Sequence, residues 1–326
     1  MGAIFWWKAG RARAAPLPCA CRSFLPDRRR NKVEIVLAEE MGFCQGVRRA
    51  LEMAEGAARE GKAIRTLGDL VHNPQVVERL RRLGIEVVKG VDEVGPDQVA
   101  MVTAHGAPPE VFAEAGKRGL TLLDATCPLV ERVQRLAQEM AGDGYGVVIC
   151  GDPGHVEVRG ILGHAGAGAV AGRTLEEVRE NAQSRGLPLP WQTHRRLAVL
   201  FQTTQREEVY RTFASELARE AMGSLRELRI FNTVCAAVAR REPAARKLAA
   251  EVEAVIVVGG RHSANTRHLA ESCAATGVPT YLIERAEEIR PEWLAGLRRV
   301  GVTAGTSTPD ETVAEVVEHL RRLGGG

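Results

Sequence analysis

The feature that most constrains the fold of this 326-residue chain is a threefold internal repeat. Three cysteines, Cys44, Cys127 and Cys235, each stand between a short apolar run and an amphipathic helical pattern. A polar residue follows each cysteine 28 positions later; these residues are His72, His155 and Ser263. Repeats of this kind indicate similar structural units that pack on one another. Three units that each offer one thiol and polar groups from strand ends can surround a common centre.

Each unit also contains a further strand-like run that ends in a polar turn. The polar residues are His105 in TAHG, Thr203 in QTT and Ser307 in GTSTPD. Apolar strands that alternate with helices predict parallel sheets covered on both faces, so the expected fold class is α/β with three pseudo-threefold-related units. The expected division is a basic leader at 1–32 and α/β units at 33–126, 127–227 and 228–326.

The candidate residues follow predicted strands, where parallel α/β sheets bind their ligands. Two of the segments that carry them, DPGHVEVRG and RHSANTRH, are expected to be loops. The neighbouring helix starts offer unpaired N–H groups and partial positive charge, which suit thiolates and phosphates. The three units are therefore expected to point their functional edges toward one another.

The leader and the body of the chain differ in charge. Residues 1–32 carry eight Lys or Arg against one acid, and the remainder carries 36 basic and 40 acidic residues. A mildly acidic body does not indicate nucleic-acid binding. We expect residues 1–32 to be a disordered extension or, alternatively, a plastid transit peptide. No apolar run is long enough to cross a membrane, and the expected location is the cytoplasm.

Seven cysteines, an odd number, argue against a disulfide framework and for a reducing compartment. Cys19 and Cys21 fall in the leader. Cys150 closes the strand run GVVIC and Cys273 lies in the helical pattern HLAESCAA, so both are expected to be buried apolar residues. The repeat therefore singles out the remaining three cysteines.

Three thiolates from three units suggest an iron–sulfur cluster. A 4Fe–4S cluster normally takes four cysteines, so three ligands would leave one iron open to substrate. A structural zinc site would usually need four ligands in two close pairs, and no such pair occurs among the three. Burial of three cysteines at equivalent positions of a repeat is the remaining alternative.

The polar residues of the repeat predict an anion site. The set comprises His72, His105, His155, Thr203, Ser263, Asn265 and Ser307. Taken singly, each histidine is consistent with a structural hydrogen bond and each hydroxyl with a helix cap. Together they form a donor-rich lining suited to a diphosphate. Glu157 is the one acid of the set, and burial beside an anion would raise its pKa, as a proton donor requires.

The motifs GFCQGVRRA, VHNPQVV, TAHG, DATCPLV, GHVEV, QTT, NTVCAA, HSANT and VTAGTSTPD occur in order from about Val33 to Leu323. In this order they resemble the LytB (IspH) family of 4-hydroxy-3-methylbut-2-enyl diphosphate reductases. Val156 and Ala264 depart from the family pattern, which often has proline and a second serine there. The segment CAAVARRE also lacks the threonine and glutamine often seen after the third cysteine.

The resemblance implies a trefoil of three α/β units around a central 4Fe–4S cluster and the last step of the non-mevalonate isoprenoid pathway. It implies cluster ligation by Cys44, Cys127 and Cys235 and proton delivery by Glu157 through Thr203. By the same resemblance, His72, His105, His155, Thr203, Ser263, Asn265 and Ser307 bind the diphosphate substrate. A ferredoxin or flavodoxin is the implied electron donor, and the choice between monomer and homodimer stays open.

Two other classes of function remain open from the sequence. A three-cysteine iron–sulfur dehydratase or condensing enzyme of the quinolinate synthase type would use an open iron without net electron input. A zinc-stabilised binding protein would catalyse nothing.

Overall fold

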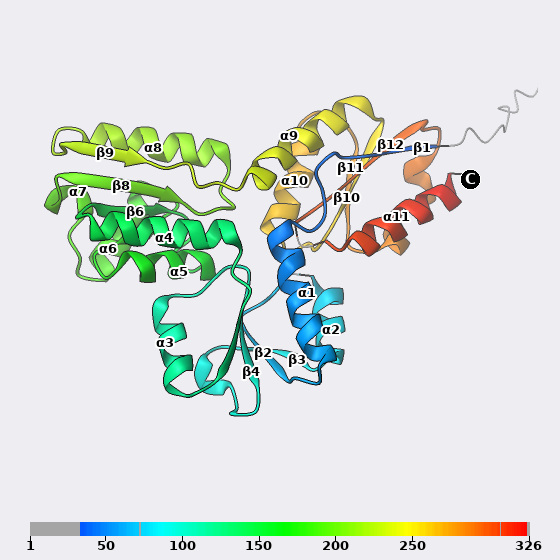
Figure 1. Cartoon of the computed structure of the whole chain (residues 1–326). Helices are drawn as coiled ribbons and strands as arrows, with labels where there is room; N and C mark the ends of the chain where they lie inside the picture. The colour runs from blue at the N-terminus through cyan, green and yellow to red at the C-terminus, as the bar shows by residue number, and fades with distance from the viewer. Residues whose placement is uncertain (1–32, 72, 307, 325–326) are drawn as a thin grey trace, which may run out of the picture.

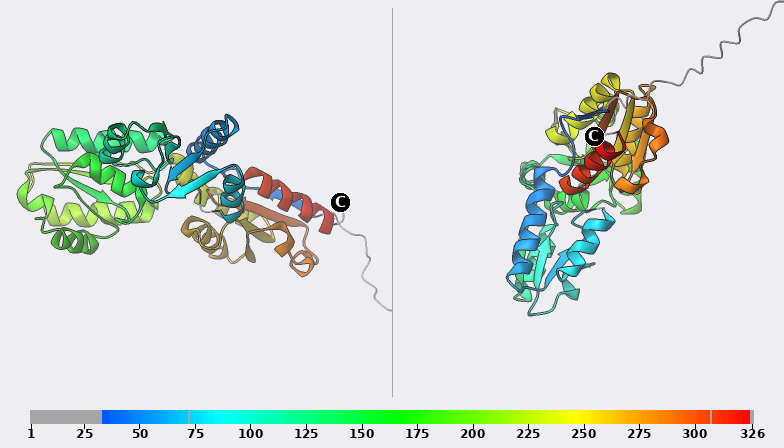
Figure 2. Two further views of the ribbon diagram at one scale, coloured as in Figure 1. Left: turned by 90° about the horizontal axis from the view of Figure 1, so that it is seen from below. Right: turned by 90° about the vertical axis from the view of Figure 1, so that its right-hand side faces the viewer.

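Three parallel four-stranded sheets form the framework of the protein, whose computed structural model describes residues 33–71, 73–306 and 308–324. Each sheet belongs to its own lobe (Figure 1). The second and third lobes lie at opposite ends of the molecule, and the first lobe joins them from one side (Figure 2). The leader at 1–32, His72 and Ser307 lie outside the described residues.

The first lobe contains the sheet with strand order β3-β2-β4-β5. Its elements are α1 Gln45–Arg59, β2 Ile64–Leu67, α2 Pro74–Arg82, β3 Ile85–Val88, β4 Val99–Val102, α3 Pro109–Lys117 and β5 Thr121–Asp124, with a short 3-10 turn at Val91–Glu93. Met101 of β4 packs into a core with α1 and α2, whereas Ala100 faces a smaller cluster around Val94.

The second lobe contains the sheet with order β7-β6-β8-β9. Its elements are α4 Pro128–Gly142, β6 Gly146–Cys150, α5 Val156–Ala165, β7 Val170–Gly172, α6 Leu175–Ser184, α7 Pro190–Thr193, β8 Arg196–Phe201, α8 Glu207–Ala221 and β9 Glu227–Ile230. Alternate residues of β6 enter opposite cores. Ile149 packs with α4 and α5, and Val148 packs with α6 and α8. Burial on both faces explains the continuous apolar run GVVIC.

The third lobe contains the sheet with order β1-β12-β10-β11. Its elements are β1 Glu34–Leu37, α9 Ala236–Glu251, β10 Ala254–Val258, α10 Ala264–Ala274, β11 Thr280–Ile283, β12 Arg299–Ala304 and α11 Asp310–Leu323, with 3-10 turns at Ala286–Glu288 and Pro291–Leu294. Ile256 of β10 packs against α11, and Val257 packs against α9 and α10. The predicted α/β class with parallel sheets is confirmed.

Hydrogen bonding assigns two strands differently from the predicted division of the chain. β1, expected in the unit 33–126, pairs with β12 in the third lobe, with Glu34 opposite Arg299. β9, expected mainly in the unit 228–326, pairs with β8 in the second lobe. β1 thus extends the sheet of the third lobe, and β9 extends that of the second. The helix that follows each strand lies in another lobe: α1 in the first and α9 in the third. The expected assignment of β1 and β9 was therefore wrong, because an apolar run does not reveal which sheet it joins.

Two further cysteine predictions are confirmed. Cys150 and Cys273 are fully buried in apolar cores, and burial raises the pKa of their thiols to about 12 and about 11 respectively. Within the described part of the chain, no helix combines the length and the apolar character that a bilayer crossing requires.

Candidate functional site

Three helices begin at the junction of the lobes, and a cysteine stands at the start of each. Cys44, Cys127 and Cys235 are the N-cap residues of α1, α4 and α9, and none of their side chains caps its own helix. All three are partly buried and free. The starts of these helices face the middle of the molecule (Figure 1). The thiols thus remain available at the positive ends of three helices.

Backbone hydrogen bonds hold the three cysteine segments in equivalent positions. The Cys127 N–H donates to the carbonyl of Ala104 at 3.0 Å, and the Cys235 N–H donates to that of Thr203 at 2.8 Å. In the third lobe the N–H of Gly42 donates to Ala304 at 3.4 Å. Each acceptor lies at or just beyond the carboxyl end of a central strand. The cysteines consequently lie at the edges where parallel sheets offer ligand sites.

Two neighbouring thiols act electrostatically on Cys127. Burial raises the pKa of Cys127, and the Cys44 and Cys235 thiolates raise it further, while the N–H groups of Leu129 and Val130 lower it. Close packing contributes to this arrangement, because Gly46 of α1 lies directly against the Cys127 side chain. A Cβ atom at Gly46 would lie 2.8 Å from the Cys127 sulfur. The first helix can approach the second thiol only because residue 46 is glycine.

We expect Gly46→Ala to displace the Cys127 thiol. Overpacking of this kind typically costs about 1–3 kcal/mol, so both the free energy of unfolding and the iron bound after anaerobic reconstitution should fall. The matched control is Gly56→Ala in the same helix, where an added Cβ meets no atom within 4 Å. The control should gain up to about 1 kcal/mol of helix stability. Equal iron content in both variants would contradict the packing argument.

A buried acid and two imidazoles lie next to the cysteine segments. Glu157 is 1% exposed, and its Oε1 accepts the N–H of Thr203 at 2.6 Å. Burial raises the pKa of Glu157 to about 7, although hydrogen bonds from the backbone and side chain of Thr203 lower it. The ring of His105 meets that of His155 edge to face at 5.3 Å between centroids. Because the carbonyl of Thr203 accepts the Cys235 N–H, one residue links the acid to the third cysteine.

The third lobe contributes hydroxyl and amide groups. Ser263 is buried and its Oγ accepts the N–H of Thr266 at 3.3 Å, while the side-chain amide of Asn265 donates to Thr306 Oγ1 at 2.9 Å. Gly259 of the same lobe lies close to Thr308. A Cβ atom at residue 259 would lie 2.7 Å from the Thr308 hydroxyl oxygen, so glycine allows these two segments to pack together.

Two segments expected to be loops begin helices instead. His155 is the N-cap of α5, and its Nδ1 accepts the Glu157 N–H at 3.2 Å. Ser263 is the N-cap of α10 in the same way. Glu157 and Asn265 therefore lie in the first turns of these helices. The loop expectation was wrong because polar caps, rather than apolar periodicity, determine where these helices begin.

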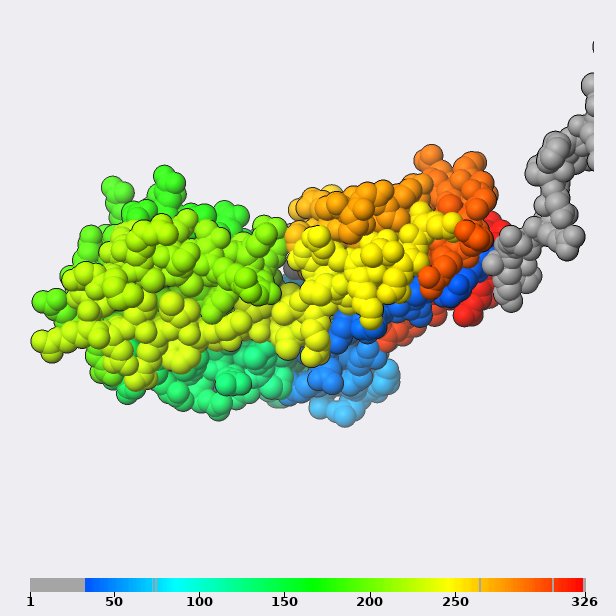
Figure 3. Space-filling model, turned by 90° about the horizontal axis from the view of Figure 1, so that it is seen from above, coloured from blue at the N-terminus to red at the C-terminus, as the bar shows by residue number. Residues whose placement is uncertain are grey.

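A cleft of about 250 Å³ separates the second lobe from the third beside these groups. Thr204 and Arg206 line it from the segment before α8, and Arg241, Asn265 and His268 line it from α9 and α10. The space-filling view shows the surface hollowed at this junction (Figure 3). Hydroxyl, amide and guanidinium groups from two lobes thus face one space, which the carboxylates of Glu207, Glu208 and Glu242 also line.

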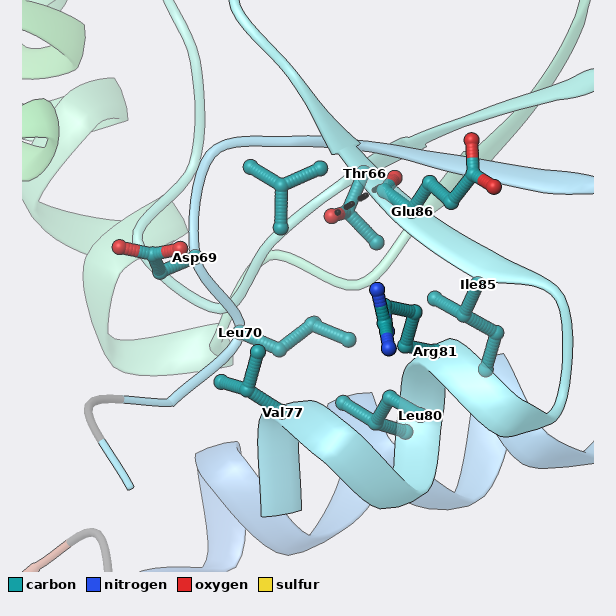
Figure 4. A pocket seen from close by; sticks show the side chains of 9 residues that line it. Thr66, Asp69, Leu70, Val77, Leu80, Arg81, Ile85 and Glu86 are labelled. Atoms are coloured by element: carbon teal, nitrogen blue, oxygen red, sulfur yellow. Dashed lines mark hydrogen bonds between the residues drawn. The ribbon is translucent and has the colours of Figure 1, made fainter. Parts of the chain in front are cut away.

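Another cavity, of about 430 Å³, lies within the first lobe. Its apolar lining comes from Leu70, Val77, Leu80, Ile85 and Val87, and its polar lining from Thr66, Asp69, Arg81 and Glu86 (Figure 4). None of the candidate residues lines this cavity. Asn265, by contrast, lines the cleft between the lobes, so that cleft is the better candidate site.

Two residues of the site were not singled out from the sequence. Gly46 stands two positions after Cys44 in GFCQG, and glycine next to a candidate ligand is a signal of close approach. Arg241 lies in the charged run ARRE, which is typical of a solvated helix face. In the structure Arg241 is only 4% exposed.

Fold and site define a three-lobed α/β protein with a thiol-lined centre and a buried carboxyl group beside it. The LytB protein family model matches residues 35–321, and the chain belongs to this family. The alternative of a quinolinate synthase-type enzyme is not favoured, because the match to this other family spans nearly the whole described chain.

Curated relatives and solved structures agree with the family match. A 4-hydroxy-3-methylbut-2-enyl diphosphate reductase of Geobacter metallireducens is 42% identical over 89% of this chain and 98% of its own length. One from Aquifex aeolicus is 38% identical over 89% and 97%.

Among solved structures, (E)-4-hydroxy-3-methyl-but-2-enyl diphosphate reductase, described as the terminal enzyme of the non-mevalonate pathway, is 37% identical. It superposes with a TM-score of 0.71 over 89% of this chain and 99% of that chain. The corresponding Plasmodium falciparum reductase gives a TM-score of 0.75 at 26% identity over 88% and 87%.

Proposed function

We propose that this protein reduces (E)-4-hydroxy-3-methylbut-2-enyl diphosphate to isopentenyl and dimethylallyl diphosphates. The observation that carries the proposal is the convergence of three helix-start thiols beside a buried Glu157 with a pKa of about 7, in a chain of the LytB family. The reaction replaces a hydroxyl group by hydrogen, consumes two electrons and two protons, and releases water.

We propose a 4Fe–4S cluster held by Cys44, Cys127 and Cys235. Within residues 33–71, 73–306 and 308–324, no three His, Cys, Asp or Glu side chains are placed so that they could hold a single metal ion. A cluster of several irons would suit the three thiols better, because Cys44, Cys127 and Cys235 would hold it from three separate helix starts. Cys127, whose pKa is raised by burial and by the neighbouring Cys44 and Cys235, is also a group whose thiolate a cationic cluster would stabilise. Such a cluster supplies electrons one at a time and a Lewis-acidic iron that lacks a thiolate.

The chain's own residues bind the substrate and handle its protons. Ser263, Asn265 and the histidines offer donors to the diphosphate, with the N-termini of α5 and α10 nearby. His72 and Ser307 are proposed for the same role on the sequence resemblance alone. Glu157, whose pKa of about 7 keeps a substantial fraction of the carboxyl protonated at neutral pH, gives its proton toward the departing hydroxyl through Thr203. Holding the allylic group in place can lower the barrier by up to roughly 7–11 kcal/mol.

The electrons must come from a low-potential one-electron carrier, and we propose a ferredoxin or flavodoxin. We also propose a cytoplasmic location, because the described cysteines are all free, as expected in a reducing compartment.

The decisive test is an anaerobic assay of the reconstituted full chain with the allylic diphosphate and a low-potential reductant. We expect both five-carbon diphosphates to form only when reductant is present, since the reaction consumes two electrons. Mass spectrometry of the products checks this. Conversion without reductant, or a loaded protein that converts nothing, would overturn the proposal.

A further inference from the structure

Arg241 of α9 is a buried cation whose guanidinium group is only partly hydrogen-bonded among the described residues. It is 4% exposed. Its Nη2 donates to the carbonyl of Gly42 at 2.6 Å, which ties α9 to the segment before Cys44. Its Nε and Nη1 are buried and have no partner among the described residues. A buried guanidinium with two unpaired nitrogens is costly, so a compensating negative charge is required nearby.

The charges that act on Arg241 come from two thiols and one acid. The Cys44 thiol, Glu40 and the Cys235 thiol act on it, in that order of strength, and raise its pKa against the larger lowering by burial. Glu40 is already paired, because its Oε1 accepts a hydrogen bond from Arg240 at 3.0 Å. The thiolates of Cys44 and Cys235 therefore remain as the main charges that can compensate Arg241.

We propose that Arg241 is the fixed positive charge of the three-thiolate centre and raises its reduction potential. This inference rests on the proposed function, since it concerns the redox centre that the thiolates hold. Each electron received from the external donor adds one negative charge to the centre. A nearby buried cation stabilises the reduced state more than the oxidised state, and burial keeps solvent from screening it. Arg241 is thus a positioning residue that acts through the thiolates.

The test compares Arg241→Gln with Arg241→Lys in the full chain, loaded with iron and sulfide under anaerobic conditions. Either replacement can donate a hydrogen bond toward Gly42, but only lysine carries a charge. The reduction potential is measured by mediated titration followed by electron paramagnetic resonance. We expect a shift to a more negative potential in Arg241→Gln and a smaller shift in Arg241→Lys. The control Lys247→Gln removes an exposed cation of the same helix, whose partner Glu39 does not act on Arg241, and should leave the potential unchanged.

Each outcome separates the inference from the proposed function. A wild-type chain that holds no cluster would refute the proposed function itself. Loaded variants with the same potential as wild type would refute only the role of Arg241. If Arg241→Gln loses its iron while Arg241→Lys retains it, the charge is required to hold the thiolates together, which supports the inference. Loss of iron in both variants would make Arg241 an anchor for Gly42 and overturn it.

Discussion

Replacement of Glu157 by glutamine is expected to lower turnover by about 10²–10⁴-fold, the usual contribution of a general acid. The amide can still accept the Thr203 N–H, which now meets Glu157 Oε1 at 2.6 Å, so the fold and the diphosphate site should persist. The amide cannot release a proton. Single-turnover kinetics with the loaded variant, together with its substrate affinity and iron content, measure the effect. Wild-type turnover would remove Glu157 from the reaction.

The pH dependence provides the control. Because the pKa of Glu157 is about 7, turnover should decrease as pH rises through 7 and the carboxyl group loses its proton. The Glu157→Gln variant should lack this limb. The free energy of unfolding should also decrease as pH rises. The contribution of the protonated Glu157 carboxyl is complete below about pH 4.5, where the unfolded chain also holds the proton, and it is lost as pH rises through about 7.

Cys127→Ser is expected to abolish stable cluster binding and to reduce turnover to background. The Cys127 side chain lies against Gly46, and the other two thiols act on its pKa. Serine there replaces a soft sulfur ligand of the proposed cluster by a hydroxyl group. Iron and sulfide analysis, with absorbance near 400 nm, measures the loss after anaerobic purification.

Cys273→Ala is the matched control for cysteine replacement. Its sulfur is fully buried between α9 and α10 and contacts the carbonyl of Ala245 rather than the other thiols. The control should retain its iron and lose only modest stability. A full iron complement and normal activity in Cys127→Ser would contradict the proposed ligand set.

Local patterns in the sequence predicted much of the fold. The runs GVVIC and AVIVV are apolar on both faces, which predicted strands of parallel sheets covered on both sides. The partners of β1 and β9 could not be predicted in this way. Each is a four-residue strand with partly exposed residues, and its place depends on hydrogen bonds to β12 and β8. Such pairing is a property of the assembled chain.

In the candidate site, too, some residues could be predicted from the sequence, whereas others depend on contacts between distant segments. Repeat positions predicted the three cysteines, because similar contexts recur at similar spacing, and Glu157 was predicted as the one acid of the accompanying polar set. Arg240 and Arg241 are adjacent and chemically identical, yet one is exposed and the other buried. Arg241 donates a hydrogen bond to the carbonyl of Gly42, 199 residues earlier in the chain, and the sequence does not reveal this contact. A sequence pattern can predict which face of a helix is apolar. It cannot predict which distant segment packs against that helix.

The pairing of β1 with β12 also bears on how the polypeptide matures during translation. Residues 34–37 leave the ribosome among the first described residues, and their partner at 299–302 emerges among the last. The first and second lobes can form from continuous stretches of nascent chain, whereas the third lobe is completed only when synthesis nears its end. A ribosome that stalls after the second lobe would therefore release a chain whose opening strand still lacks its partner.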